Sequence, residues 1–388
     1  MWIAQSVAVM GFSFAFPFMP LFVQEIGISD PVQAALWAGI SGSAMGVAMF
    51  FFGPAWGMLG DRYGRKKNVI RAMVGGGVLL ALSGLSANVY QLTVFRFFSG
   101  IAGGVFAPVM ALVASTSPKE RIPFCMGVLQ SAMFFGSTVG PLLGGFLADA
   151  VGYRAAFLVA GGIVVLAGLL VLTFARENFQ RPSDIGFIFR HDALAGLFSL
   201  VTSKQVAPIL VTIFVVQVAP VLMFTVLPVL LNVLMPSSGA SATGVAFAIL
   251  GVTAALASYG TGWLSARVRL TRLLAVACVG AGLFYLPLLV VDAVPLLYLF
   301  LGLGGVFQGA LLSSTSGLLG LAVPPEKQGS GFGALQSVSS AAFGFGPLAG
   351  GAIAVVAGLR SVFLAQAVIL FASAVLVVLL LSGEEAKE

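Results

Sequence analysis

The amino-acid sequence predicts an all-α polytopic membrane protein, with twelve transmembrane helices arranged as two six-helix bundles. Three observations predict this fold: the composition, a series of long charge-free runs, and an internal repeat. Of the 388 residues, 59% are hydrophobic and 8% are charged, whereas soluble domains carry about 25% charged residues. Because so few charges could not cover a water-exposed surface, the composition excludes a soluble enzyme, a disordered chain and a fibrous protein.

Segments without Asp, Glu, Lys, Arg or His mark the membrane spans. A span needs about 20 residues, and the first runs from Met1 to about Val23. Because the run 205–266 is too long for one helix, we expect two spans separated at Pro236–Gly239. The fourth span is expected to continue across Arg96 and to cover 90–114 as one helix. The charge-free runs are 31–60, 72–95, 97–118, 122–148, 155–175, 205–266, 273–291, 293–325, 328–359 and 361–383.

The lysine and arginine residues predict the orientation. With the N-terminus in the cytoplasm, 16 of the 19 lysine and arginine residues fall in loops after even-numbered spans or in the C-terminal tail. Arg154 and Arg360 fall on the outer side, and Arg96 lies inside the fourth span. This asymmetry is typical of a multi-pass protein of the inner (plasma) membrane with both termini in the cytoplasm. We expect the basic residues to meet anionic membrane lipid and not nucleic acid.

An internal repeat divides the chain into two halves. A constant spacing of 206 residues relates Leu129 to Leu335, Gln130 to Gln336 and several later positions. Two repeats in the same orientation build a two-bundle protein with its central site between the halves, near the membrane midplane. The predicted parts are an N-terminal bundle over 1–175, a cytoplasmic linker over 176–206 whose segment 185–201 is able to lie in the membrane interface, a C-terminal bundle over 207–382 and a cytoplasmic tail over 383–388.

The loop after the second span carries a glycine-rich, basic motif. Residues 57–66 read G-M-L-G-D-R-Y-G-R-K, which resembles the G-x-L-a-D-R-x-G-R-[KR] signature of the major facilitator superfamily. The resemblance implies a conformational latch that stabilises one access state, and the alternative is a basic loop that only sets topology and holds a local ion pair. The expected latch residues are Gly57, Asp61, Arg62, Gly64, Arg65 and Lys66.

The fifth span carries a second motif, which resembles the G-x-x-x-G-P-x-x-G-G sequence of the drug:proton antiporters in that superfamily. Glycines spaced by four lie on one face of a helix and allow close helix packing, and an internal proline adds a bend. The alternative is ordinary packing of small residues, but a copy of the motif recurs in the eleventh span. The motif residues are Gly136, Gly140, Pro141, Gly144 and Gly145.

Aromatic residues, methionines and isolated glutamines predict a substrate cavity. Because amides are costly when they face lipid, glutamines within spans are expected to face the cavity, and methionines and aromatics can repack around several hydrophobic ligands. The expected cavity residues are Phe12, Phe16, Gln130, Met133, Phe134, Gln217, Phe224, Gln308 and Gln336.

Proton coupling needs a titratable group, yet the central parts of the spans contain no Asp or Glu. We expect Glu25, coupled to Arg96, to serve as the proton-coupling pair. For Arg96 the alternative is that its side chain snorkels toward the outer interface. Asp149 is expected to cap the turn after its own span, close to Arg154.

The resemblance implies a secondary active transporter that exports lipophilic or amphipathic drugs in exchange for protons by alternating access. The alternatives are an exporter of one metabolite, such as a sugar or a siderophore, and a non-transporting membrane sensor with the same fold. No nucleophile–base constellation indicates an enzyme, and no Cys/His cluster indicates a metal site. We expect a monomer without a cofactor, whose partners are a small-molecule substrate, protons and membrane lipid.

Overall fold

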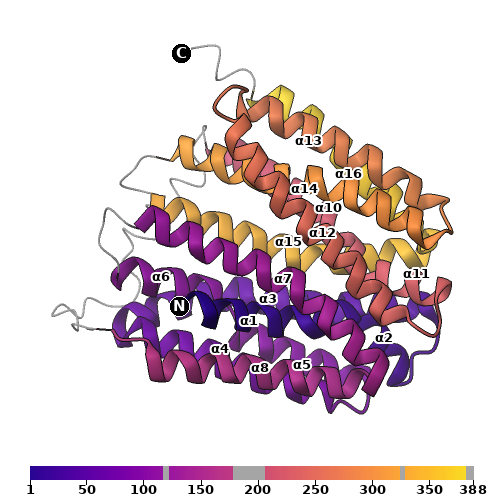
Figure 1. Ribbon diagram of the computed structural model, residues 1–388, viewed down its shortest axis with the longest axis horizontal. Helices are drawn as coiled ribbons and strands as arrows, with labels where there is room; N and C mark the ends of the chain where they lie inside the picture. The colour runs from indigo at the N-terminus through magenta and orange to yellow at the C-terminus, as the bar shows by residue number, and fades with distance from the viewer. Residues whose placement is uncertain (117–121, 178–205, 324–327, 382–388) are drawn as a thin grey trace.

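The first half of the chain opens with a broken helix. The computed structural model describes residues 1–116, 122–177, 206–323 and 328–381, and its regular elements are helices (Figure 1). The opening helix consists of α1 (Trp2–Ala15), the 3-10 turn η1 (Phe16–Phe18) and α2 (Met19–Glu25). It breaks here because Pro17 and Pro20 lack the N–H that would continue the helical ladder. The other helices are α3 (Pro31–Tyr63), α4 (Arg65–Gly84), α5 (Val89–Ala102), α6 (Phe106–Thr116), α7 (Ile122–Val151) and α8 (Tyr153–Phe174).

The second half opens with the same kind of break. Here α10 (Val206–Leu222) leads through the 3-10 turn η3 (Met223–Thr225) into α11 (Leu227–Leu234), with Pro220 and Pro228 on either side of the break. The equivalent breaks agree with the internal repeat of the sequence. The remaining elements are α12 (Gly239–Leu264), α13 (Leu270–Tyr285), the 3-10 turn η4 (Leu286–Leu289), α14 (Val294–Ala322), α15 (Gln328–Ala357) and α16 (Ser361–Leu381).

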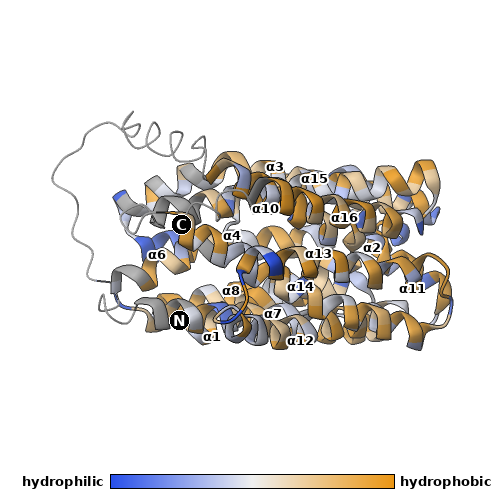
Figure 2. Ribbon diagram, turned by 90° about the horizontal axis from the view of Figure 1, so that it is seen from above, coloured by the Kyte–Doolittle hydropathy of each residue, from blue (hydrophilic) through white to orange (hydrophobic). Residues whose placement is uncertain are grey.

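The prediction of twelve spans is confirmed. Ten spans within the described ranges are long and apolar enough to cross a membrane. The helix α4, and α5 together with α6, take the two other positions. Hydrophobic residues run along the helices, while hydrophilic ones gather mainly near the helix ends (Figure 2), as a lipid environment requires. The segment 185–201 and the tail 383–388 lie outside the described residues, as does most of the linker.

The prediction of one continuous helix over 90–114 was wrong. Between α5 and α6 the chain passes through Gly104, whose φ of +81° favours glycine. The carbonyls freed at the end of α5 have found other donors: the Trp56 Nε1–H donates to Ile101 O at 2.7 Å, and Arg71 Nη1 donates to Ala102 O at 2.8 Å. These side-chain bonds offset the cost of interrupting a helix within the membrane.

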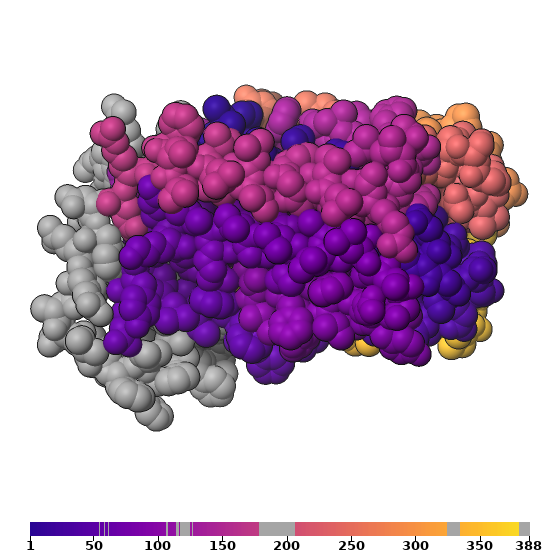
Figure 3. Space-filling model, turned by 90° about the horizontal axis from the view of Figure 1, so that it is seen from below, coloured from indigo at the N-terminus to yellow at the C-terminus, as the bar shows by residue number. Residues whose placement is uncertain are grey.

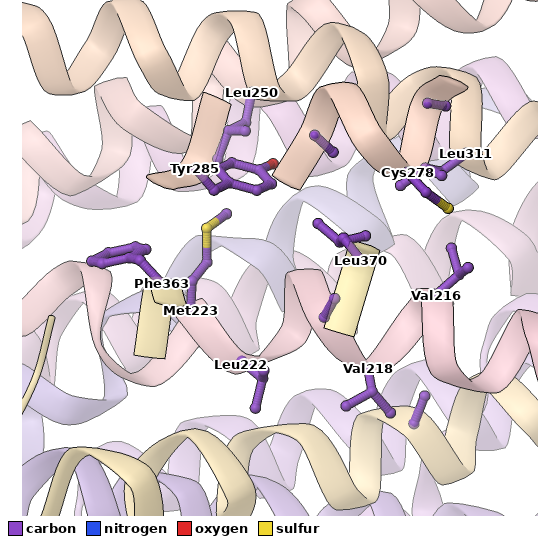
Figure 4. Close-up of a cluster of buried hydrophobic side chains, with 14 of the residues drawn as sticks. Val216, Val218, Leu222, Met223, Leu250, Cys278, Tyr285, Leu311, Phe363 and Leu370 are labelled. Carbon is purple, nitrogen blue, oxygen red and sulfur yellow. The ribbon is translucent and has the colours of Figure 1, made fainter. Parts of the chain in front are cut away.

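Each half has its own core of buried apolar side chains. In the second half, Tyr285, Phe363 and Met223 lie toward one another between α13, α16 and η3 (Figure 4). In the first half, α8 packs along α4, and the two form much of the molecular face shown in Figure 3. The two cores meet along the boundary between the halves, because Ala35 of the first half belongs to the second core and Ala240 of the second half belongs to the first.

Two helix pairs join the halves. The helix α3 packs on α15, and α7 packs on α12, in the most extensive contacts across the boundary; the yellow α15 runs beside helices of the first half in Figure 1. We call these pairs the α3–α15 seam and the α7–α12 seam. Their backbones approach closely: a Cβ added at Gly351 would lie 2.7 Å from Leu36 Cα, and one at Gly244 would lie 3.2 Å from Leu142 Cα. Small residues at these positions permit this packing.

Both seams are closed toward one end of the molecule only. We call the end with the turn at Gly64 the basic end and the end with Glu25 and Asp149 the far end, which lie at the left and right of Figure 1. Closer to the basic end, a Cβ added at Gly53 of α3, or at Gly262 on the same face of α12 as Gly244, would have no atom within 4 Å. The halves therefore diverge toward the basic end and leave room for a cavity there.

Candidate functional site

A cavity of about 510 Å³ lies in the region where the halves diverge. Most of its wall comes from the first half, and α15 supplies the wall from the second half. The interrupted fourth span contributes directly, because the chain between α5 and α6 lines the cavity. The lining residues are Gln5, Val9, Phe12, Met45, Met49, Phe50, Gly53, Trp56, Gly57, Gly60, Arg65, Asn68, Gly103, Gly104, Val105, Pro108, Ala111, Gln336, Ser337 and Ser340.

Gln5 is the most unusual polar group of this wall. Its side chain is fully buried, and neither amide atom has a hydrogen-bond partner among the described residues. An unpaired buried amide costs about 1–3 kcal/mol of stability. A ligand group that forms a hydrogen bond with this amide would recover part of that free energy. Sequence reasoning missed Gln5 because it lies near the chain start. The signal that could have found it is an amide on the same helix as the predicted Phe12.

Two of the predicted cavity residues, Phe12 and Gln336, line the cavity. Two other glutamines bond within the second half: Gln217 Nε2 donates to Ser339 Oγ at 2.8 Å, and Gln308 Oε1 accepts from the Tyr285 hydroxyl at 3.0 Å. The three candidates on α7 are partly or largely exposed and are not lining residues of this cavity: Gln130, Met133 and Phe134.

The two remaining predicted cavity residues, Phe16 and Phe224, belong to an aromatic cluster that crosses the boundary between the halves. The ring centroids of Phe16 and Phe343 are 5.1 Å apart, those of Phe16 and Phe224 are 5.8 Å apart, and Phe224 stacks on Phe247 at 5.0 Å. Phe16 of η1 follows Phe12 of α1, and Phe343 follows Ser340 on α15, by about one helical turn toward the far end. The cluster, Phe16, Phe224, Phe247 and Phe343, thus joins the halves beyond the far side of the cavity.

The latch residues contact their own half. Gly64 has a φ of +107° and forms the turn between α3 and α4. The backbone N–H groups of Arg65 and Lys66 both donate to the Glu177 carboxylate at 2.9 Å, so an acid that sequence reasoning missed caps α4. Lys66 Nζ donates to Leu172 O at 2.8 Å.

Among the described residues, the contacts of Arg62 and Gly57 do not reach the second half. Arg62 lies over the Tyr63 ring, a Cβ added at Gly57 would have no atom within 4 Å, and the Asp61 side chain lies outside the described part of the structure.

The fifth-span motif has two packing faces. A Cβ added at Gly136 or Gly140 would meet the α1 backbone near Met10, and one at Gly144 would meet it at Phe14. The second face points to the other half: Gly145 packs on the Ala240 carbonyl, and the Pro141 carbonyl lies against Gly244. The motif therefore holds α1, α7 and α12 together, in the way that its glycine spacing predicts.

The proposed coupling residues do not pair with each other. Glu25 Oε1 lies 3.3 Å from Arg154 Nε. Arg96 is 2% exposed, so the alternative that it snorkels to the interface is wrong. Its Nη1 lies 3.9 Å from the Met45 sulfur, its guanidinium lies over the Phe157 ring, and its Nε and Nη2 have no partner among the described residues. A buried cation thus lies directly behind Met45, which lines the cavity.

The sequence predicted that Asp149 caps the turn after its own helix, but the structure places its carboxylate elsewhere. Its Oδ2 accepts from the backbone N–H of Ser241 at 2.7 Å, and its Oδ1 accepts from that of Ala240 at 3.3 Å. Both donors belong to the first turn of α12, in the other half. The turn after α7 leads into α8, whose N-cap Gly152 has no side-chain capping bond, and Arg154, the cation expected near Asp149, is paired with Glu25.

Comparisons with known proteins agree with this geometry. A profile described as Major Facilitator Superfamily matches residues 1–294 and 286–388. "Multidrug resistance protein MdtG" of Enterobacter lignolyticus is 30% identical over 376 residues, which is 96% of this chain and 89% of that protein. The protein of the same name from Salmonella arizonae is 31% identical over 373 residues, covering 95% of this chain and 92% of that protein.

Solved structures show the same fold. A bacterial homolog of the human lysosomal transporter Spinster, in an inward-facing and occupied conformation, gives a TM-score of 0.79 at 16% identity and covers 98% of this chain and 95% of that chain. The human organic anion transporter MFSD10 (TETRAN) gives a TM-score of 0.71 at 19% identity, covering 97% of each chain.

Proposed function

The chain belongs to the major facilitator superfamily, and from this premise we propose that it exports lipophilic or amphipathic drugs in exchange for protons by alternating access. The observation that carries the proposal is the cavity between the halves, beyond which the aromatic cluster and both seams hold the halves together toward the far end. Rocking of the halves about this site would close the basic end and open the far end.

The basic end faces the cytoplasm in this proposal. Arg62, Arg65, Lys66 and Lys67 all lie at that end, and cytoplasmic loops of membrane proteins carry an excess of such residues. The described conformation is then inward-facing, ready to take substrate from the cytoplasm or the inner leaflet of a bacterial inner membrane. We propose that the protein acts as a monomer, since each chain contains a complete cavity.

The cavity wall favours neutral or anionic amphipathic molecules. Its aromatic and methionine side chains offer an adaptable apolar surface, and the amides of Gln5 and Gln336 offer hydrogen bonds. Among the described residues, its lining includes Arg65 but no Asp or Glu, and Arg96 lies behind Met45. A sugar exporter would need more polar groups, so a drug exporter is favoured over a carrier of one polar metabolite.

We propose that the latch residues engage the second half only when the basic end closes. In the inward-facing state their loop is held by Glu177 and Leu172 of its own half, which leaves the seam at this end free to open. Glu25 and Arg96 keep their proposed roles in coupling, as separate residues. A proton taken up by Glu25 would release Arg154, and the Arg96 charge would act on a ligand through the cavity wall.

Efflux from proteoliposomes tests the proposal. The purified protein is reconstituted with an amphipathic fluorescent dye, and dye movement is followed with and without an imposed pH gradient. We expect gradient-dependent flux that a protonophore abolishes. Dye binding without any flux would favour the sensor alternative, and flux that ignores the gradient would contradict proton coupling.

A further inference from the structure

The first turn of α12 lacks a cap of its own. Ser238, at the N-cap position, makes no side-chain capping bond, and the first turn contains no acid. The free N–H groups at a helix start favour a negative charge. That charge comes from Asp149, near the end of α7, which accepts from Ser241 and Ala240. A carboxylate of one half therefore caps a helix of the other half.

This contact exists only while the α7–α12 seam is closed at the far end. One turn before Asp149, Gly145 packs on the Ala240 carbonyl and lies close to Ser241 Cα. A rocking motion that separates α7 from α12 here must also separate the carboxylate from its two donors. The bond consequently stabilises the state with the far end closed and adds nothing to the state with the far end open.

Within the described ranges, the α3–α15 seam has no equivalent contact between a carboxylate and a helix start. The repeat spacing places Val355 of α15 at the position of Asp149, and α3, the partner of α15, is capped by its own Asp30, which accepts from the Gln33 N–H at 2.7 Å. The trans-half cap is therefore a single, asymmetric contact, so one substitution can remove it.

The charged and titratable groups around Asp149 leave the first turn of α12 as the partner of its carboxylate. Neither the first turn of α12 nor α11 carries a titratable group. From α8, Tyr153 lies within electrostatic range of Asp149 and Glu25, and Arg154 is paired with Glu25 of α2. Asp149 is itself exposed at the far end, so protons from that side reach it directly.

We propose that Asp149 is a pH-sensitive lock of the far end: ionised, it holds α7 to α12 and keeps the far end closed, and protonated, it releases them. The inference rests on the proposed alternating-access function and deepens it. Protonation removes the charge that the α12 dipole attracts and one of the two acceptors. Because Asp149 stays on the far side in either state, it senses the proton concentration there and does not carry the proton across.

Distances across the far end test this lock without any transport assay. Spin labels are placed at the exposed positions Ala87 and Ala293, one in each half, after replacement of Cys125 and Cys278 by alanine. We expect the wild-type distance distribution to shift toward longer values when the pH falls. Asp149→Asn is expected to show the long distances already at neutral pH and to lose the response to acid, whereas Asp149→Glu, which keeps the charge, retains it.

The matched control is Asp292→Asn. Asp292 is also an acid of the far end, but its partner Arg360 lies in the same half, so this variant is expected to behave as wild type. A wild-type distribution unchanged by acid, or an Asp149→Asn distribution equal to wild type at neutral pH, would overturn the proposal. The distance measurement needs neither a dye nor a pH gradient. It therefore tests the lock even if the efflux assay shows no proton-coupled transport.

Discussion

Phe16 and Phe343 face each other across the boundary between the halves, with ring centroids 5.1 Å apart and ring planes inclined by 34°. One ring comes from the break in the first helix and the other from α15. Such a pair contributes about 0.5–1.5 kcal/mol beyond its buried area, and here that energy is available only to the state in which the far end is closed.

Phe16→Ala should weaken this closure. We expect the substitution to shift the equilibrium toward an open far end by about tenfold, since about 1.4 kcal/mol corresponds to that factor. Spin-label distances across the far end measure the shift. The control is Phe345→Ala, because Phe345 pairs with Phe214 inside the second half; an equal shift in both variants would argue against a gate at Phe16.

Gln5→Leu should raise the stability of the protein and weaken substrate binding. The native amide is buried without a partner among the described residues, so leucine is expected to raise the unfolding temperature. The same change is expected to weaken substrate binding by about tenfold or more, equivalent to one hydrogen bond of about 1.5 kcal/mol. Thermal unfolding and equilibrium dye binding give the two readings.

Gln366 provides the control for that experiment. It is also fully buried, and neither amide atom has a partner in the described part of the chain, but it lies on α16 and is not a lining residue of the cavity. Gln366→Leu should raise stability and leave binding unchanged. If Gln5→Leu left binding unchanged as well, the amide would have no part in the substrate site.

Gly145→Val should disfavour the described conformation. A side chain at this position meets the α12 backbone at Ala240, and overpacking of this kind costs about 1–3 kcal/mol. The far end should therefore open more often, as measured by cross-seam distances. Gly262→Val, on the same face of α12 where no atom of α7 is within reach, should leave the far end closed; opening in both variants would mean that the effect is not local to the closed contact.

Arg96→Met should stabilise the protein and impair transport. The guanidinium is buried, and two of its nitrogens have no partner among the described residues; relieving a buried charge is worth on the order of 2 kcal/mol. Unfolding temperature and dye flux are the readouts. Arg360→Met is the comparison, because Arg360 has Asp292 as its partner and its loss should bring no gain in stability. A less stable Arg96→Met protein would show that Arg96 has a structural partner.

Much of the fold could be predicted because lipid imposes simple rules on sequence. Charge-free runs located the spans, and the spacing of Gly136, Gly140 and Gly144 located a close helix contact. The break at Gly104 was not predicted, because it depends on Trp56 and Arg71. These two side chains come from distant parts of the chain and donate hydrogen bonds to the freed carbonyls.

The site was predicted less completely, because its polar contacts join segments that are far apart in the chain. Phe12 and Gln336 were found from residue type alone, while Gln5 gave no signal beyond its amide. The partners of Asp149 and of the Arg65 backbone, on α12 and at Glu177, depend on how helix ends meet in space. A single sequence carries no record of such pairings.

Thiol labelling at Gly53 from either side of the membrane tests the inward-facing cavity most directly. Gly53 lines the cavity near the basic end, where an added side chain has open space. In a background without Cys125 and Cys278, Gly53→Cys should react with an impermeant maleimide in inside-out vesicles and stay unreactive in right-side-out ones, while Ala293→Cys shows the opposite pattern. Faster labelling of Gly53→Cys from the outside would contradict both the orientation and the closed far end.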